Sequence, residues 1–221
     1  MTAAPGARVA VDVALFTVRD DALHVLVVQT AGGPFAGAWA LPGGLVRENE
    51  PLDDAAAREL FARTGVGDVY LEQLYTFGSP DRDPHARVVS VAYVGLIPHG
   101  GRFAGTLDHP KYRQVAWYPV RRLPPLAYDH AEVVRTAVGR VRAKLAYTNL
   151  VYTLLPPTFT LSELQAVYEA ILGRRLDRRN FRKKMLSTGL LATLGRERRG
   201  AHRPAALYRF RRRRPATVAM L

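Results

Sequence analysis

The first question that the sequence raises is whether the predicted helix at 51–63 can hold a metal ion through Glu59 and the residues beside it. Glu59 and positions 62 and 63 share a face of this helix, because residues three and four apart are neighbours on a helix surface. Magnesium is held in proteins by oxygen ligands, usually including carboxylates. Ala62 offers no ligand, and Arg63 brings a fixed positive charge. Two unit charges ~4 Å apart interact by about 4 kcal/mol at an effective dielectric of 20, so Arg63 would repel a metal cation bound beside it by at least this order. We therefore predict no metal site and no catalytic residue here.

A second set of residues is basic and suits the recognition of nucleic acid. A helix predicted from Arg178 to Thr188 begins after Asp177 and buries Phe181 and Met185. Its other face carries five candidate DNA contacts: Arg178, Arg179, Asn180, Arg182 and Lys183. Arg can bind guanine and Asn adenine in the major groove, and Arg and Lys also bind phosphates. The loop that follows adds four further candidates: Arg196, Arg198, Arg199 and Arg203.

Charge is divided unevenly along the 221 residues. Residues 1–140 carry 14 Lys/Arg and 15 Asp/Glu, whereas residues 141–221 carry 18 Lys/Arg and 4 Asp/Glu. This asymmetry predicts a first domain at 1–140 and a second domain at 141–214 whose partner is a polyanion, foremost nucleic acid. The tail from Arg211 to Leu221 is expected to be disordered, and 215–221 lies outside both domains.

The composition also excludes several classes of site. The chain has no cysteine, which excludes disulfides, thiolate zinc sites and cysteine nucleophiles. No run approaches the roughly 18 apolar residues of a membrane-spanning helix, and the N-terminus lacks the regions of a signal peptide. We therefore expect a soluble cytoplasmic protein with no membrane partner.

The elements that position these residues follow from hydrophobic periodicity. Strands are predicted at 9–18, 23–30, 69–77, 88–97 and 115–120. Helices are predicted at 51–63, where Gly65 stands beyond the end, and after Asp129. The basic part is predicted to hold helices at 141–155, 160–172 and 178–188, then strands at 190–194 and 205–210. Three helices followed by a hairpin are the outline of a winged helix-turn-helix.

Residues 44–66, GLVRENEPLDDAAARELFARTGV, resemble the Nudix box, G-x5-E-x7-R-E-U-x-E-E-x-G-U, in which U is aliphatic. Seven positions match: Gly44, Glu50, Arg58, Glu59, Leu60, Gly65 and Val66. The resemblance implies an α/β fold, a Nudix α/β/α sandwich with a mixed sheet. In the family, glutamates stand at the positions of Ala62 and Arg63 and hold magnesium against a pyrophosphate. Because both are missing, we expect hydrolysis to be very slow or absent, and no cofactor.

The role of Arg63 in ligand binding has two interpretations. It either holds pyrophosphate oxygens bidentately in place of a metal or pairs with Glu59 or Glu50 within the protein. Gly44 and Glu59, which belong to the same motif, complete this part of the predicted ligand site.

Further ligand candidates come from a likeness to Nudix proteins that act on ADP-ribose, whose corresponding loop the segment 77–87 resembles. Arg82 and Arg87 are candidate phosphate contacts, and the alternative for Arg82 is an ion pair with Asp83. Phe35 or Trp39 either stacks on a base or fills the core.

The combination of both parts resembles the family of Nudix-related transcriptional regulators of NAD metabolism (NrtR). Further segments carry the likeness: 123–130 (LPPLAYDH), 144–148 (KLAYT), 154–156 (LLP), 159–165, 180–181 and 208–210. It implies a homodimer that binds palindromic DNA, represses genes of NAD biosynthesis or salvage, and is released by ADP-ribose or a related nucleotide.

Two alternatives remain open. The first is a working magnesium-dependent ADP-ribose pyrophosphatase with a DNA-binding appendage, against which Ala62 and Arg63 argue. The second is an RNA-binding Nudix relative, which the basic helix disfavours because the major groove of duplex RNA is too deep and narrow for it.

Overall fold

The structure, a computed structural model, describes residues 6–98, 112–198, 204–214 and 216. The chain forms two compact units. The first comprises Met1–Phe16 and His24–Ala137, and the second comprises Thr17–Leu23 and Val138–Leu221. The predicted domain limits at residues 140 and 214 stay predictions. No helix in the described ranges is long and apolar enough to cross a membrane.

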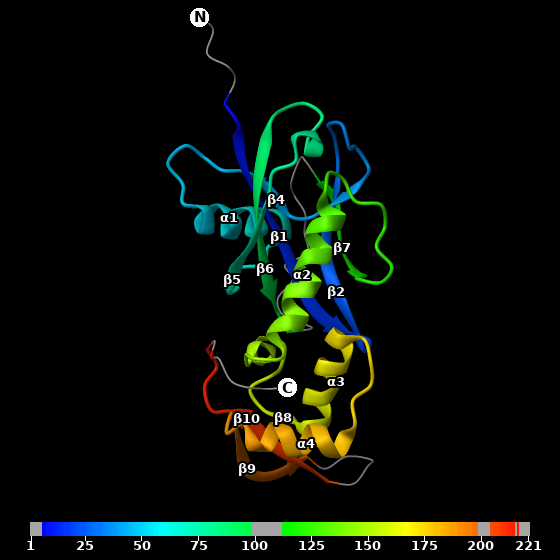
Figure 1. The fold of residues 1–221 in the computed structure, drawn as a ribbon, viewed down its shortest axis with the longest axis vertical. Helices are drawn as coiled ribbons and strands as arrows, with labels where there is room; N and C mark the ends of the chain where they lie inside the picture. The colour runs from blue at the N-terminus through cyan, green and yellow to red at the C-terminus, as the bar shows by residue number, and fades with distance from the viewer. Residues whose placement is uncertain (1–5, 99–111, 199–203, 215, 217–221) are drawn as a thin grey trace, which may run out of the picture. The chain divides into compact units, whose positions relative to one another are not determined.

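A mixed sheet forms the centre of the first unit (Figure 1). Its strands in the described residues are β1 (Arg8–Arg19), β2 (Ala22–Thr30), β3 (Trp39–Ala40), β4 (Gly43–Leu45), β5 (Leu71–Phe77), β6 (Val88–Leu96) and β7 (Tyr112–Pro119). Strand β1 lies between β2 and β6, is parallel to β6 and is antiparallel to β4. Strands β3 and β7 pair with β2, and β5 pairs with β6, all antiparallel. The predicted mixed sheet and α/β class are confirmed.

Helix α1 (Leu52–Thr64) packs against this sheet. It begins after Pro51 and ends at Gly65, whose φ of 68° lets its N–H bond to the carbonyl of Phe61 at 2.8 Å. The apolar side chains of α1 that join the core are Ala55, Ala56 and Leu60, and two of the three are small. They pack against core residues from β1, β2 and β6. Small residues bring the helix close to the sheet, so that Glu59 and Arg63 are only 5% and 7% exposed.

The second unit contains a short helix pair and a small sheet. Its elements are the C-terminal part of α2 (His130–Lys144), the 3-10 helix η2 (Leu150–Thr153), β8 (Phe159–Thr160), α3 (Leu161–Leu172), α4 (Arg178–Ser187), β9 (Leu191–Arg198) and β10 (Ala205–Phe210). The strands are antiparallel in the order β8-β10-β9. Thr160 and Glu163 form a capping box at the start of α3. The winged helix fold is thereby confirmed, with one more strand than predicted.

The predicted helix at 141–155 is wrong. Helix α2 ends at Lys144, and only the short η2 follows. Polar side chains there bond to backbone groups and compete with helix formation. The Thr148 hydroxyl donates to the Lys144 carbonyl at 2.9 Å, and the Asn149 amide donates to the carbonyl of Arg214 at 3.0 Å.

The prediction that disorder begins at Arg211 is also wrong. The Arg211 N–H donates to the Leu190 carbonyl at 2.8 Å. Arg213 donates from Nη2 to the carbonyls of Tyr152 and Leu155, at 2.7 and 2.8 Å, and from Nη1 to that of Pro156 at 3.2 Å. Of the tail at 215–221, only Ala216 lies within the described residues, and its N–H donates to Asn149 Oδ1 at 2.8 Å.

Candidate functional site

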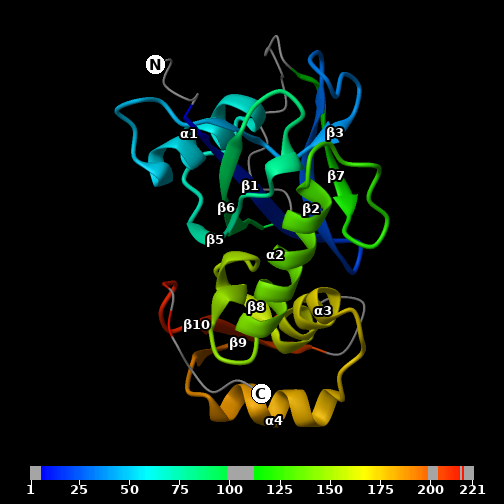
Figure 2. The same ribbon diagram turned by 45° about the horizontal axis from the view of Figure 1, so that its top comes forward.

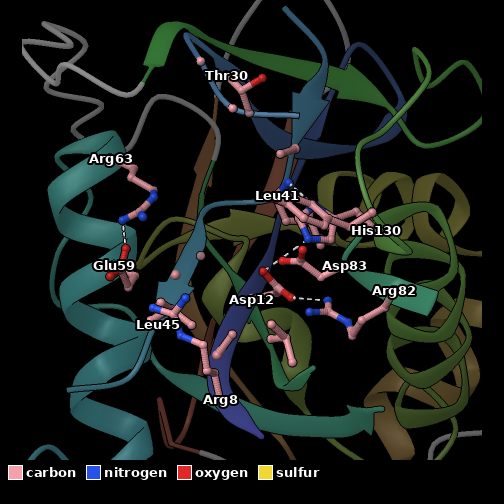
Figure 3. Close-up of a pocket in the computed structure, with 18 of the residues that line it drawn as sticks. Arg8, Asp12, Thr30, Leu41, Leu45, Glu59, Arg63, Arg82, Asp83 and His130 are labelled. Carbon is pink, nitrogen blue, oxygen red and sulfur yellow. Dashed lines mark hydrogen bonds and ion pairs between the residues drawn. The ribbon is translucent and has the colours of Figure 1, made fainter. Parts of the chain in front are cut away.

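A cavity of about 710 Å³ lies in the first unit, within the size range of small-molecule sites. Strands β1 and β4, helix α1, the 3-10 helix η1 (Pro80–Arg82) and the start of α2 contribute to its lining, and Figure 3 shows the side chains that face it. Four of the predicted ligand residues line this cavity: Gly44, Glu59, Arg63 and Arg82. The other three, Phe35, Trp39 and Arg87, are not among the described residues that line it.

Glu59, the carboxylate that α1 contributes to the described lining of the cavity, has two arginine partners. Glu59 pairs through one oxygen with Arg58. Its other oxygen pairs with Arg63 (Figure 3). Glu50 accepts two hydrogen bonds from Arg58, at 2.5 and 2.7 Å. The hydrogen bonding of Arg58, helped by the Arg47 backbone N–H and by the charges of both arginines, outweighs burial and lowers the pKa of Glu50 to about 2. Arg63 thus makes the ion pair within the helix that the sequence left open, and its role toward a pyrophosphate stays a prediction.

This face does not fit a magnesium ion. Both oxygens of Glu59 carry positively charged partners, and Ala62 supplies no ligand. Among the described residues, no group of three or more His, Asp or Glu side chains is placed to hold a metal ion. Gly44 preserves the ion pairs, because a Cβ at this position would come within 2.7 Å of Arg63 Nη2 and of Glu59 Oε1.

The opposite side of the cavity contains a buried polar cluster around Asp12 (Figure 3). Asp12 Oδ2 accepts from Arg82 Nη2 at 3.1 Å and from Ser90 Oγ at 2.5 Å, and Asp12 Oδ1 lies 3.3 Å from His130 Nε2. Arg82 also donates to both oxygens of Asp129, at 3.0 and 2.8 Å. The suggested Arg82–Asp83 pair is therefore wrong, because two better placed acids hold this guanidinium.

Sequence reasoning missed this cluster, because its members are far apart in the chain. Burial raises the pKa of Asp12, but the charge and hydrogen bond of His130, with Ser90 and Arg82, outweigh burial and lower the pKa to about 2. His130 Nδ1 accepts from the Leu41 N–H at 2.9 Å, so that Nε2 is the nitrogen that carries a proton toward Asp12. Asp12 is therefore a buried anion that is paired with Arg82 and His130.

Two further arginines give the cavity its capacity for anions. Arg8 and Arg47 are exposed, line the cavity and make no ion pair within the described part of the chain. Neither was singled out from the sequence, since nothing in their spacing distinguishes them from ordinary surface residues. They are the lining groups best placed to meet phosphates without breaking an internal ion pair.

The three predicted residues outside the lining have structural contacts instead. The Phe35 ring lies 4.5 Å from that of Tyr128, which itself lines the cavity. Trp39 packs edge-on against Tyr118 with 5.1 Å between ring centroids. Arg87 donates to the carbonyls of Ser79 and Val88, each at 3.3 Å. For these residues the packing alternative accounts for the observed contacts, and ligand contact stays a prediction.

The second candidate site is the outer face of α4. Phe181 and Met185 are buried, and Phe181 packs edge-on against Tyr168 of α3 with 5.2 Å between centroids. Figure 2 shows α3 and the strands on one side of α4 and none of these elements on the other. Asp177 caps the helix by accepting from the Asn180 N–H at 2.7 Å. Packing thus turns one face of α4 outward.

The outward face of α4 carries the predicted DNA contacts. A hollow on it is lined by Arg179, Asn180, Arg182, Lys183 and Leu186. None of the three basic residues in this hollow makes an ion pair within the described ranges. Arg178 is exposed at the helix start and donates to Ser162 Oγ at 3.4 Å. Base and phosphate contacts by these residues stay predictions.

The predicted wing contacts differ from one another. Arg196 is exposed, whereas Arg198 pairs with Glu163 of the α3 capping box at 2.5 Å. Arg199 and Arg203 lie outside the described residues. Of the wing candidates that the structure describes, Arg196 is therefore the one without an acidic partner.

Comparison with known proteins identifies both parts of the chain. Residues 7–137 match the NUDIX domain, and residues 151–210 match the NrtR DNA-binding winged helix domain. The chain is 35% identical over 208 residues to the "ADPR responsive transcriptional repressor NtrR" of Acinetobacter baylyi. The alignment covers 93% of this chain and 83% of the relative.

Two solved structures from Shewanella oneidensis extend this result. NrtR complexed with a 27mer DNA matches with a TM-score of 0.81 and 35% identity, over 92% of this chain and 93% of that chain. The NUDIX domain of NrtR complexed with ADP ribose matches with a TM-score of 0.57 and 35% identity, over 62% of this chain and 90% of that chain. The chain therefore belongs to the NrtR family, whose members join a NUDIX domain to an NrtR DNA-binding winged helix domain.

Proposed function

We propose that this protein is a transcriptional repressor that responds to ADP-ribose or a related nucleotide. One observation carries the proposal: a cavity whose Glu59 and Asp12 carboxylates are already paired with arginines is joined in one chain to a helix whose basic face has no acidic partners in the described residues. The cavity suits an anion that is bound but not cut, and the helix suits DNA. The ADP-ribose and DNA complexes of the Shewanella relative support the same assignment.

The protein acts as a homodimer on palindromic DNA, because two modules that read two half-sites raise both affinity and the length of the site. The regulated genes are those of NAD biosynthesis or salvage, as the family implies, and the protein works in the cytoplasm, where its DNA lies. Release by nucleotide requires that ADP-ribose bind the DNA-free form more tightly than the DNA-bound form.

A DNA-shift titration against the region upstream of the protein's own gene tests this function. We expect binding at low salt that ADP-ribose reverses, whereas AMP at the same concentration reverses it less, because AMP lacks the diphosphate. A nucleotide that leaves the DNA affinity unchanged would contradict a responsive repressor.

The alternative hydrolase is tested separately. Incubation with magnesium and ADP-ribose should give turnover far below 1 per second, which lies at the low end of the usual enzyme range of roughly 1–1,000 per second. The Ala62→Glu/Arg63→Glu variant serves as the comparison, because it restores carboxylates to the helix face. Turnover by the unmodified protein near 1 per second or faster would establish the enzyme instead.

The contribution of Arg63 to nucleotide binding has a matched control. Arg63→Ala leaves Glu59 with one arginine and removes a cation from the cavity, so we expect ADP-ribose affinity to fall by about tenfold. Arg135→Ala removes an exposed guanidinium of α2 that does not line the cavity and should change affinity little. Equal affinities of both variants and the unmodified protein, measured by calorimetry, would assign Arg63 a purely structural role.

A further inference from the structure

The second unit contains a pocket of its own, of about 300 Å³, between α3 and α4. Four largely apolar side chains form most of its wall: Tyr168, Leu176, Phe181 and Met185. Three polar residues complete the lining: Asp177, Asn180 and Lys184. None of these residues takes part in the cavity of the first unit. The volume is at the lower end for small-molecule sites and suits a compound with one ring.

The Tyr168 hydroxyl is the unusual feature of this pocket. Tyr168 is fully buried, and its hydroxyl has no hydrogen-bond partner in the described part of the chain. Buried polar groups are paired in the great majority of proteins, and an unpaired one calls for a specific cause. Burial raises the pKa of Tyr168, which keeps the hydroxyl neutral and able to donate. Tyr168 is thus a lining residue of the pocket whose buried donor is not used by any described group.

The remaining polar groups of the pocket differ in their availability. The carboxylate of Asp177 is occupied, because it caps α4 through the Asn180 N–H at 2.7 Å. The Lys184 ammonium makes no ion pair among the described residues, and the Asn180 side chain makes no hydrogen bond there. One cation and one amide thus accompany the hydroxyl, which favours a ligand with a negative charge.

We propose that this pocket binds a small aromatic carboxylate that carries a hydrogen-bond acceptor on the far side of its ring. The ring packs against Tyr168 and Phe181, whose own edge-on contact shows the geometry that aromatic pairs prefer. The acceptor pairs with the Tyr168 hydroxyl, and the carboxylate lies near Lys184. Such a compound satisfies the buried donor and the unpaired cation together.

This pocket shares a residue with the outer face of α4. Asn180 lines both the pocket and the hollow on the outer face of α4. Phe181 and Met185, which anchor the helix, form part of the same wall. A bound ring therefore lies against the side chains that seat α4.

The test is a direct binding titration of the full chain, by calorimetry or ligand-detected NMR, without DNA. The probes are 4-hydroxybenzoate, benzoate, which lacks the acceptor, and 4-hydroxybenzamide, which lacks the charge. We expect 4-hydroxybenzoate to bind with a Kd of about 1 mM or tighter, which is reasonable for a ligand of this size. Benzoate and the amide should each bind about tenfold more weakly.

Matched variants locate the binding. Tyr168→Phe removes only the unpaired hydroxyl, keeps the ring and should abolish the difference between 4-hydroxybenzoate and benzoate. Lys184→Gln should abolish the difference between the acid and the amide. Lys183→Gln is the control, because Lys183 lines the outer hollow and not the pocket; it should leave all probe affinities unchanged.

Two results would overturn the proposal. One is the absence of 4-hydroxybenzoate binding at ~10 mM, ten times the expected Kd. The other is binding that Tyr168→Phe and Lys184→Gln both leave as it was, which would mark an adventitious contact elsewhere. Neither result bears on ADP-ribose or DNA binding, so the proposed function stands or falls independently.

Discussion

The cavity of the first unit and helix α4 are both rich in arginine, but most of the described arginines that line the cavity have acidic partners and those on α4 do not. In the cavity, Arg58, Arg63 and Arg82 are paired with acids of the same chain. On α4, Arg179 and Arg182 face outward and have no acidic partner in the described residues. An arginine surrounded by carboxylates neutralises a site, whereas an arginine without them attracts an external anion. Residue type alone therefore does not separate the two roles, and the distribution of acids does.

The largest expected difference between the two regions is in salt dependence. If six to ten basic residues contact phosphates, DNA affinity should fall by roughly three to five decades between 50 and 200 mM salt. Arg179→Ala or Arg182→Ala should each reduce the salt slope by about 1. ADP-ribose affinity, measured over the same range, should change far less, because in the described lining only Arg8 and Arg47 are arginines without an acidic partner, against roughly six to ten basic residues for DNA. Equal salt dependence of the DNA and ADP-ribose affinities would show that the arginines of the two regions do not differ in this respect.

The next effect concerns the stability of the first unit. Arg82→Ala leaves Asp12 and Asp129 without their shared cation, and removal of one partner from a buried ion pair costs about 3–5 kcal/mol. Urea unfolding followed by tryptophan fluorescence reports on this unit, because Trp39 and Trp117 both belong to it. Arg179→Ala, on α4, should leave that transition in place. A change below ~1 kcal/mol, typical of an exposed pair, would show that Arg82 is not needed for the cluster.

Acid should weaken the same cluster. The folded pKa of Asp12, about 2, is below its ordinary value of 3.8, so its contribution to stability is present above pH 4 and is lost as the pH falls toward 2. The shift corresponds to about 2 kcal/mol. Asp12→Asn should flatten this part of the acid-unfolding curve. Glu50→Gln is the necessary comparison, because the pKa of Glu50 is also lowered to about 2. If Asp12→Asn unfolds in acid along the same curve as the unmodified protein, Asp12 does not contribute to the loss of stability in acid.

A smaller effect tests whether some basic residues of the second unit stabilise the fold rather than remain available to bind DNA. Arg213 is bound to three backbone carbonyls, whereas Arg212 makes no hydrogen bond within the described residues. Arg213→Ala should destabilise the second unit by about 1–3 kcal/mol, and Arg212→Ala should not. Thermal unfolding followed by far-ultraviolet circular dichroism measures both. Equal melting temperatures for the two variants would show that the hydrogen bonds of Arg213 do not stabilise the second unit.

The sequence predicted what depends on local pattern. The end of α1 at Gly65 and the start of α4 at Asp177 follow from capping chemistry that needs only neighbouring residues. The Nudix motif likewise predicted that Glu59 and Arg63 share one face. The predicted helix at 141–155 failed, because Asn149 is held by residues more than sixty positions later, which no local window contains.

The same limit applies to the sites. Glu59 and Arg63 are four residues apart and were found, whereas Asp12, Arg82 and His130 come together only through the sheet and were not assembled in advance. The unpaired hydroxyl of Tyr168 is likewise invisible in sequence, where the residue fits the apolar stripe of α3. Spacing identifies partners on one element, and pairing across elements requires the fold.

The contacts of Asn149 have a consequence for protein engineering. Its backbone and side chain bond to Arg214 and Ala216, so that the two ends of the segment 149–216, which contains the winged helix match at 151–210, are tied together. Adjacent ends are the condition under which circular permutation is tolerated. A short peptide linking residue 216 to residue 149, with new termini opened at an exposed turn such as Gly189, should yield a rearranged reader whose α3 and α4 keep their packing.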